Sequence, residues 1–220
     1  MSKTPYDPVR DFSPVSILGR YPNVLVVHPS VAASSVKELI ALAKAKPGAL
    51  NYASGPVGAS NHLAAELFKS MAGVNIVRVV YKGGGPALND VIAGQVQLLF
   101  ASTGSVVSLL KSGRLRALAV TSAQPSELVP GLPTVAASGL PGYESVSIGL
   151  LLAPPKTPAA IIRRINQALV YALNSADIKD RFSSIGVETI SSSPQELAVA
   201  MKADIARVGK LIKDAGIKDD

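Results

Sequence analysis

The sequence of 220 residues contains no cysteine. This absence excludes a disulfide framework, a thiolate metal site and a cysteine nucleophile. Aromatic residues make up only 5% of the chain, and the basic residues that give it a net charge of +7 form no polybasic block. Nucleic-acid-binding proteins usually concentrate lysine and arginine on one element and stack aromatic rings on bases. We therefore expect no nucleic-acid partner, and only a weak general attraction for acidic ligands.

Long apolar runs are also absent. No stretch approaches the length of a membrane span, so we expect no stable membrane insertion. The chain opens with the polar segment MSKTPYDPVRDF, which does not have the pattern of a secretory signal peptide. The two histidines are distant in sequence and the carboxylates are scattered, which leaves too few ligands for a metal ion. We expect neither a metal nor a cofactor.

The most informative stretch is Leu50–Met71, which reads as a strand, a glycine-containing loop and a helix. Ser54–Gly58 supplies the backbone freedom for a tight strand-to-helix turn, and Ser60 is predicted to be the N-cap of the helix. Such a helix start directs unpaired N–H groups and the positive end of the helix dipole into a crevice. The stretch is therefore either an anion-binding site or an ordinary turn of an α/β domain.

The same order of elements recurs further along the chain. The predicted strand Asn75–Tyr81 is followed by the loop Lys82–Pro86, with Pro86 placed as the first residue of the next helix. The predicted strand Val96–Phe100 is followed by the small-residue loop Ala101–Ser105. This series predicts a parallel sheet with helices on both faces. In such sheets ligands bind beyond the carboxyl ends of the strands, where the three loops converge.

The loop residues themselves favour binding over catalysis. The order Lys82-Gly83-Gly84-Gly85 differs from a GxxxxGK[ST] phosphate loop, so it is either a flexible turn or a backbone cradle for a carboxylate or small polar group. His62 and Glu66 lie one helical turn apart and form an imaginable acid–base pair, but His62 also fits a donor or packing role. No nucleophile, base and orienting group can be assembled from these loops, so we predict a binding cleft and no enzyme.

The flanking regions carry weaker signals. Val15–Leu18 and Val24–Val27 predict one long bent strand or two short ones. The spacing of Ser35 to Glu38 and of Ser193 to Glu196 is that of a helix capping box. A short helical piece is expected near Thr134–Ser138.

Several blocks in fixed order carry a resemblance to a known family. They read YASGPVGASNHLAAELF, VVYKGGGPALNDVIAGQVQ, LKSGRLRALAVTS, GLPTVAASGLPGYE and LLAPPKTP. They resemble the tripartite tricarboxylate transporter solute-binding family, the Bug-type extracytoplasmic receptors, over nearly the whole chain. The resemblance implies a type II periplasmic-binding-protein fold, in which two α/β lobes close on a small, usually carboxylated solute. It also implies a periplasmic location and delivery of the solute to a membrane permease.

The resemblance assigns residues 1–20 and 145–220 to a first lobe and residues 21–144 to a second. The signal peptide, first strand and glycine-rich loop of the family have no counterpart before Met1, so we expect a first lobe that is incomplete at its N-terminus. Apolar faces around Val15–Leu18, Leu150–Ala153 and the Ile162, Ile165 and Leu169 stripe are then expected to be uncovered. An alternative from another class is an effector-binding regulatory domain of a transcription factor, because such domains share the two-lobed architecture.

The resemblance also implies a set of ligand-binding residues. In this numbering they are Ser54, Gly55, Gly58, Ser60 and His62 in the first loop, Lys82, Gly83 and Gly84 in the second, and Ala101, Ser102 and Thr103 in the third. The family often has an aspartate at the position of Ala101. Its absence removes an acceptor for an amino group, which favours plain carboxylates over amino acids as ligands.

Overall fold

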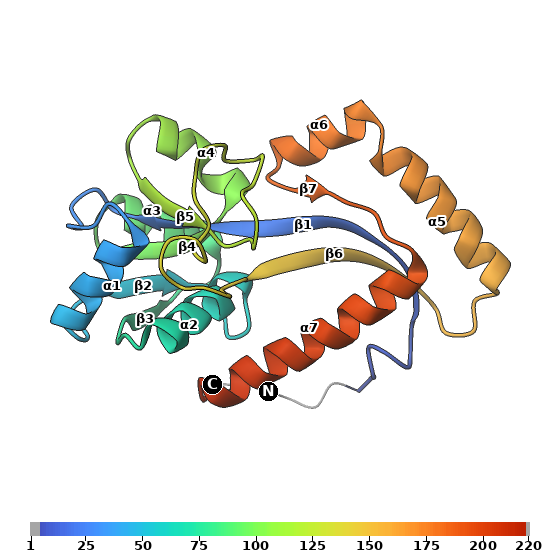
Figure 1. Ribbon diagram of the computed structural model, residues 1–220, viewed down its shortest axis with the longest axis horizontal. Coiled ribbons are helices and arrows are strands. Elements are labelled where there is room, and N and C mark those ends of the chain that lie inside the picture. Colours follow the sequence, from blue (N-terminus) through green and yellow to red (C-terminus); the bar gives the residue numbers. More distant parts are fainter. Residues whose placement is uncertain (1–4, 219–220) are drawn as a thin grey trace. The chain divides into compact units, whose positions relative to one another are not determined.

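The computed structural model describes residues 5–218 of the chain (Figure 1). The described residues divide into two compact units, one made of residues 5–21 and 147–218 and one of Pro22–Val146. Strand β1 (Ser13–Val27) contributes residues to both units, and it is one long strand rather than two. The range predicted for the first lobe includes residues 1–4 and 219–220, which lie outside the described residues. The interpretation of the units as receptor lobes stays a prediction.

The second unit is built on a mixed sheet with the strand order β3-β2-β4-β1-β5. The strands are β2 (Asn51–Ser54), β3 (Val77–Val80), β4 (Leu98–Ser102) and β5 (Arg116–Val120). Strand β2 is parallel to β3 and β4, as predicted. The sheet also contains β1, for which the sequence pattern made no prediction of pairing, and this strand lies antiparallel between β4 and β5. The local β-loop-α pattern carries no information about a strand that arrives from upstream, whereas the fully buried Val24–Val27 suits a central position.

Helices cover both faces of this sheet, as the sequence predicts (Figure 1). The helices are α1 (Val36–Ala45), α2 (Ser60–Ala72), α3 (Gly84–Ile92) and α4 (Thr103–Lys111). Leu25 and Val27 of β1 belong to the core cluster with α1 and α2, whereas Val24 and Val26 belong to the cluster with α3 and α4. Since successive strand residues point to opposite faces, this alternation places one pair of helices on each face.

The first unit has its own strands and helices. Strands β6 (Val146–Ala153) and β7 (Glu188–Thr189) pair with β1, and the helices are α5 (Ala159–Leu173), α6 (Ala176–Ser184) and α7 (Pro194–Asp214). Val15, Ala153 and Ile162 form one small core, with Ile165 and Leu169 partly buried against it. The expectation that these apolar faces are uncovered is therefore wrong for these residues, because β1, β6 and α5 cover one another.

A second small core of the first unit lies on α7. Leu197 and Met201 of that helix are buried with Ile17 of β1, and Leu150 and Leu152 of β6 pack against them. Within residues 5–218, none of the helices is both long enough and apolar enough to cross a membrane.

Three local predictions are wrong. Helix α2 has Ala59 as its N-cap and begins at Ser60, because Ala59 is the residue with extended backbone angles. Helix α3 begins at Gly84, so Pro86 is its third residue and not its first; a proline is tolerated there because the N–H groups of the first turn have no partner within the helix. Thr134–Ser138 forms turns, with one isolated bridge from Thr134 to Val120, and no helix.

The capping box of α7 is confirmed in both directions. The Glu196 N–H donates to the Ser193 hydroxyl at 3.2 Å, and the Ser193 N–H donates to the Glu196 carboxylate at 2.7 Å. At α1 the Ser35 hydroxyl caps Glu38 as predicted, and the Glu38 carboxylate accepts from the Ser34 N–H at 2.7 Å.

We predict that Ser193→Ala lowers the free energy of unfolding by about 1 kcal/mol, because the substitution leaves an N–H of the first turn of α7 without its acceptor. Urea unfolding followed by circular dichroism measures the effect. Ser184→Ala provides a matched control, since the Ser184 hydroxyl only donates to the Arg181 carbonyl at the end of α6. Equal effects of the two substitutions would contradict the capping role.

Candidate ligand-binding site

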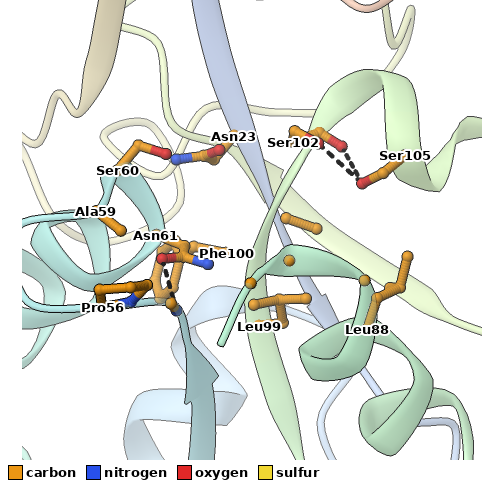
Figure 2. A pocket seen from close by; sticks show the side chains of 15 residues that line it. Asn23, Pro56, Ala59, Ser60, Asn61, Leu88, Leu99, Phe100, Ser102 and Ser105 are labelled. Carbon is orange, nitrogen blue, oxygen red and sulfur yellow. Dashed lines mark hydrogen bonds between the residues drawn. The ribbon is translucent and has the colours of Figure 1, made fainter. Parts of the chain in front are cut away.

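A cavity of about 370 Å³ opens in the second unit where strands β2, β3 and β4 end and helices α2, α3 and α4 begin (Figure 2). Its lining comes from these three strand-to-helix connections and from β1, and consists of Asn23, Gly55, Pro56, Ala59, Ser60, Asn61, Gly83, Gly84, Gly85, Leu88, Leu99, Phe100, Ala101, Ser102 and Ser105. None of these described residues carries a charge. The cavity therefore offers an anion only backbone groups, neutral side chains and helix dipoles.

The structure brings six of the eleven residues predicted from the sequence into this lining and leaves five outside it. The six are Gly55, Ser60, Gly83, Gly84, Ala101 and Ser102. The five outside are Ser54, Gly58, His62, Lys82 and Thr103. Whether the six contact a ligand stays a prediction.

In the first connection, side chains already satisfy two of the glycine N–H groups. The Gly55 N–H donates to Oδ1 of Asn61 at 3.1 Å, and the Gly58 N–H donates to Nδ1 of His62 at 3.1 Å. Gly58 has a φ of +81°, a conformation that glycine adopts without strain. These two glycines therefore shape the turn, and the N–H groups left for a ligand are those of the first turn of α2.

Arg78 of β3 also stabilises the first connection, from β2 to α2. Its Nε donates to the Ser54 hydroxyl at 2.7 Å, and its Nη2 donates to the Gly55 carbonyl at 2.9 Å. Ser54 is fully buried, and its hydroxyl also donates to the Gly55 carbonyl. The Ser54 side chain thus supports the loop and is not presented to the cavity.

The structure gives the His62 and Glu66 pair a supporting role. His62 is 3% exposed, and its Nδ1 accepts from the turn at Gly58. The Glu66 carboxylate accepts from the Tyr52 hydroxyl at 2.5 Å and from the Lys69 ammonium at 2.7 Å. Burial, together with the bond to Glu66, raises the pKa of Tyr52 above its ordinary value. These bonds fix α2 on β2, and neither residue lines the cavity.

In the second connection the glycines leave open space. A Cβ atom placed on Gly83, Gly84 or Gly85 meets nothing within 4 Å, and none of the three has a left-handed φ. Lys82 lies outside the lining. Because Pro86 has no N–H, the free donors of the first turn of α3 come from Gly84 and Gly85.

Tyr81 fixes the start of this second connection. Its N–H donates to the Ser54 carbonyl at 2.8 Å, and its hydroxyl donates to the Asp90 carboxylate of α3 at 2.6 Å. Partial burial, with the bond to Asp90, raises the pKa of Tyr81 to about 12.

We expect the free energy of unfolding to fall as the pH rises from about 10, where an ordinary tyrosine titrates, to about 12. The folded protein holds this proton more tightly than the unfolded chain, so the contribution is complete below the lower pH and is lost through the upper one. Urea unfolding across this pH range measures the decline. In Tyr81→Phe the free energy of unfolding should fall less steeply over this range. An equally steep decline in the variant would contradict the role given to Tyr81.

In the third connection β4 passes directly into α4 without a loop. Thr103 is 1% exposed, and its hydroxyl donates to the Pro22 carbonyl at 2.7 Å, so it ties α4 to β1. The Ser102 hydroxyl donates to the Ser105 hydroxyl at 2.9 Å, and the Ser105 hydroxyl donates to the Ser102 carbonyl at 2.7 Å (Figure 2). Both hydroxyl protons are therefore used within this pair.

The residue patterns did not predict Asn23, Asn61 or the apolar wall of Leu88, Leu99 and Phe100. Asn61 had a usable signal, because asparagine next to a glycine turn commonly bonds to the turn backbone. Asn23 had none, since it lies on a strand that joins the sheet only through tertiary pairing. Among the described residues, no group of three or more His, Cys, Asp or Glu side chains is placed to hold a metal ion.

The sequence and the fold are both similar to those of known proteins. Residues 1–217 match TctC, the tripartite tricarboxylate transporter family receptor. The structure of R. palustris Rpa4515 with adipate is 38% identical, with a TM-score of 0.86 over 99% of this chain and 73% of that chain. The structure of the periplasmic binding protein BugD is 27% identical, with a TM-score of 0.82 over 98% of this chain and 73% of that chain.

A curated relative, the UPF0065 protein in the tcbD-tcbE intergenic region of Pseudomonas sp. (strain P51), is 35% identical over 211 residues. The match covers 96% of this chain and 63% of the relative, so the chain spans less than two thirds of that protein's length.

The fold is that of the α/β periplasmic binding proteins. The chain belongs to the tripartite tricarboxylate transporter receptor family, TctC. The family is one of receptors, which is not a class of enzymes. The family match does not support the alternative that the chain is an effector-binding regulatory domain of a transcription factor.

Proposed function

We propose that this protein is an extracytoplasmic solute-binding receptor that captures a small organic carboxylate and delivers it to the membrane permease of a tripartite tricarboxylate-type transporter. The proposed location is the periplasm, as for BugD. The proposed ligand-binding residues are the predicted ones that line the cavity, together with the first-turn N–H groups of α2, α3 and α4.

The observation that carries the proposal is the meeting of three helix starts at one uncharged cavity. Each helix start presents N–H groups without intrahelical partners and the positive end of a dipole, so together they favour a negative group. No charged side chain of the described lining competes for that group. A carboxylate is a small organic anion that such helix starts can bind without a lysine or arginine.

The size of the cavity supports the same ligand class. Its volume of about 370 Å³ lies near the lower end of the range for small-molecule sites, which begins at about 300 Å³. Leu88, Leu99 and Phe100 give it an apolar wall that suits a short hydrocarbon chain. The related R. palustris structure with adipate has a ligand of this kind, a dicarboxylate with an apolar middle.

Isothermal titration of the chain against a panel of di- and tricarboxylates and aromatic acids tests the proposal. We expect at least one carboxylate to bind, and its diamide to bind far more weakly. A Gly84→Leu variant places a side chain in the open space beside the cavity and should abolish binding.

Gly209→Leu is the matched control, because Gly209 lies in α7 of the first unit and a Cβ atom placed there also meets nothing within 4 Å. Both variants replace a helical glycine with leucine. No heat from any panel member with the folded chain, or equal loss in both variants, would count against the proposed function.

A further inference from the structure

Asn23 of β1 is a buried polar residue whose side chain the fold does not use. It is 4% exposed and lines the cavity. Its backbone is fully engaged, because its N–H donates to the Thr121 hydroxyl at 2.8 Å and its carbonyl accepts from the Thr121 N–H at 2.9 Å. Its side-chain amide makes no hydrogen bond to the residues that the structure describes.

An amide in this position normally has a partner. Among residues 5–218, no side-chain nitrogen or oxygen that is sealed from solvent lacks one, so the polar atoms of the Asn23 amide are open to the cavity, where a ligand can bond to them. Figure 2 shows the Asn23 amide and the Ser60 hydroxyl directed toward the same part of the cavity. The backbone pairs with Thr121 hold β1 in place whatever side chain stands at this position, so the amide is free to serve a ligand.

The neighbours of Asn23 indicate what kind of group it meets. Asn23 and Ser102 are Cα partners across the antiparallel β1–β4 pair. Ser102 and Ser105 both line the cavity, and their hydroxyl protons are used within their own pair, so their oxygens keep lone pairs but have no proton left for a ligand. A second carboxylate here would meet these lone pairs. A ligand hydroxyl can donate to such an oxygen and accept from the Asn23 amide at once.

We propose that Asn23 is a specificity-determining residue of the cavity, whose amide hydrogen-bonds an uncharged polar group of the ligand, such as a hydroxyl, while the ligand carboxylate lies at the helix starts. The proposal rests on the proposed function of the same cavity. It adds that the site distinguishes a hydroxylated carboxylate from the otherwise identical acid without the hydroxyl.

Matched pairs of acids test this inference: succinate with malate, glutarate with 2-hydroxyglutarate, and propionate with lactate. Calorimetric titration of the chain should show about tenfold tighter binding for the hydroxylated member of at least one pair, the value of one good hydrogen bond. In Asn23→Leu, which keeps the size of the side chain, the two affinities of that pair should differ by less than about twofold. The acid without the hydroxyl should keep its affinity.

Asn89→Leu is the matched control, because Asn89 lies on α3 outside the lining and should leave the ratio unchanged. Thermal unfolding verifies that each variant folds, and Asn23→Ala replaces Asn23→Leu if the latter does not. Binding of carboxylates without any preference for a hydroxyl, or a preference that survives both Asn23 variants, overturns this inference alone. Absence of binding by every acid in the panel overturns the proposed function and this inference with it.

Discussion

A Ser60→Asp variant is expected to bind carboxylates at least about tenfold more weakly while it unfolds at a slightly higher denaturant concentration. Ser60 is the first residue of α2 and lines the cavity. An aspartate there complements the helix dipole, which stabilises a helix by about 0.3–1 kcal/mol at an exposed site. The same charge repels a ligand carboxylate bound by the neighbouring N–H groups, and such repulsion amounts to a few kcal/mol at close range.

The opposite signs of the two effects make the experiment decisive. Titration calorimetry measures the binding, and urea unfolding measures the stability. Ser60→Asn is the neutral counterpart and should change binding far less. Ala159→Asp is the matched control, since Ala159 is the first residue of α5 in the first unit and should gain stability without affecting the ligand. Unchanged carboxylate affinity in Ser60→Asp would place the bound anion elsewhere.

Phe68→Ala is expected to have the largest effect on stability, a loss of about 3–5 kcal/mol. Phe68 of α2 is fully buried. Its ring lies 5.8 Å from that of Phe100 and 6.4 Å from that of Tyr143, the latter in an edge-to-face arrangement. The substitution removes these contacts and leaves a cavity in a close-packed core. Phe100 also lines the ligand cavity, so its loss of support should weaken carboxylate binding as well.

The control for this prediction is Tyr171→Ala, because Tyr171 on α5 is 85% exposed. That change should alter the free energy of unfolding by less than about 0.5 kcal/mol. Urea unfolding with a fluorescence or circular-dichroism readout compares the two variants. Similar small losses for both would mean that the aromatic cluster around Phe68 does not stabilise the second unit.

The three strand-to-helix connections could be predicted from the sequence because their signals are local. A short apolar strand, a few small residues and an amphipathic helix together occupy only a short stretch of chain, and each connection contributes predicted residues to the cavity, such as Gly55, Gly83 and Ser102. The helix starts were less accurate. Ser60 has a better capping side chain than Ala59, but the backbone angles of the loop decide which residue is the N-cap.

The residue type alone did not predict whether a residue offers its polar groups to the cavity or uses them within the fold. Ser54 and Thr103 carry hydroxyl groups, yet both hydroxyls donate to backbone carbonyls that the fold places beside them. The N–H groups of Gly55 and Gly58 look available in the sequence, but Asn61 and His62 occupy them. Hydrogen-bond partners of this kind depend on small differences in loop geometry, which residue patterns do not encode.

By itself the sequence determined the order of strands and helices from β2 to α4, the placement of helices on both faces of a sheet and the family resemblance. These follow from hydrophobic periodicity and small-residue spacing, which act over a few residues. Only the tertiary structure decided that β1 enters antiparallel between β4 and β5 and carries Asn23 into the cavity. That insertion depends on hydrogen bonds between strands far apart in the chain, such as Asn23 opposite Ser102 and Val24 opposite Val120, which no local pattern specifies.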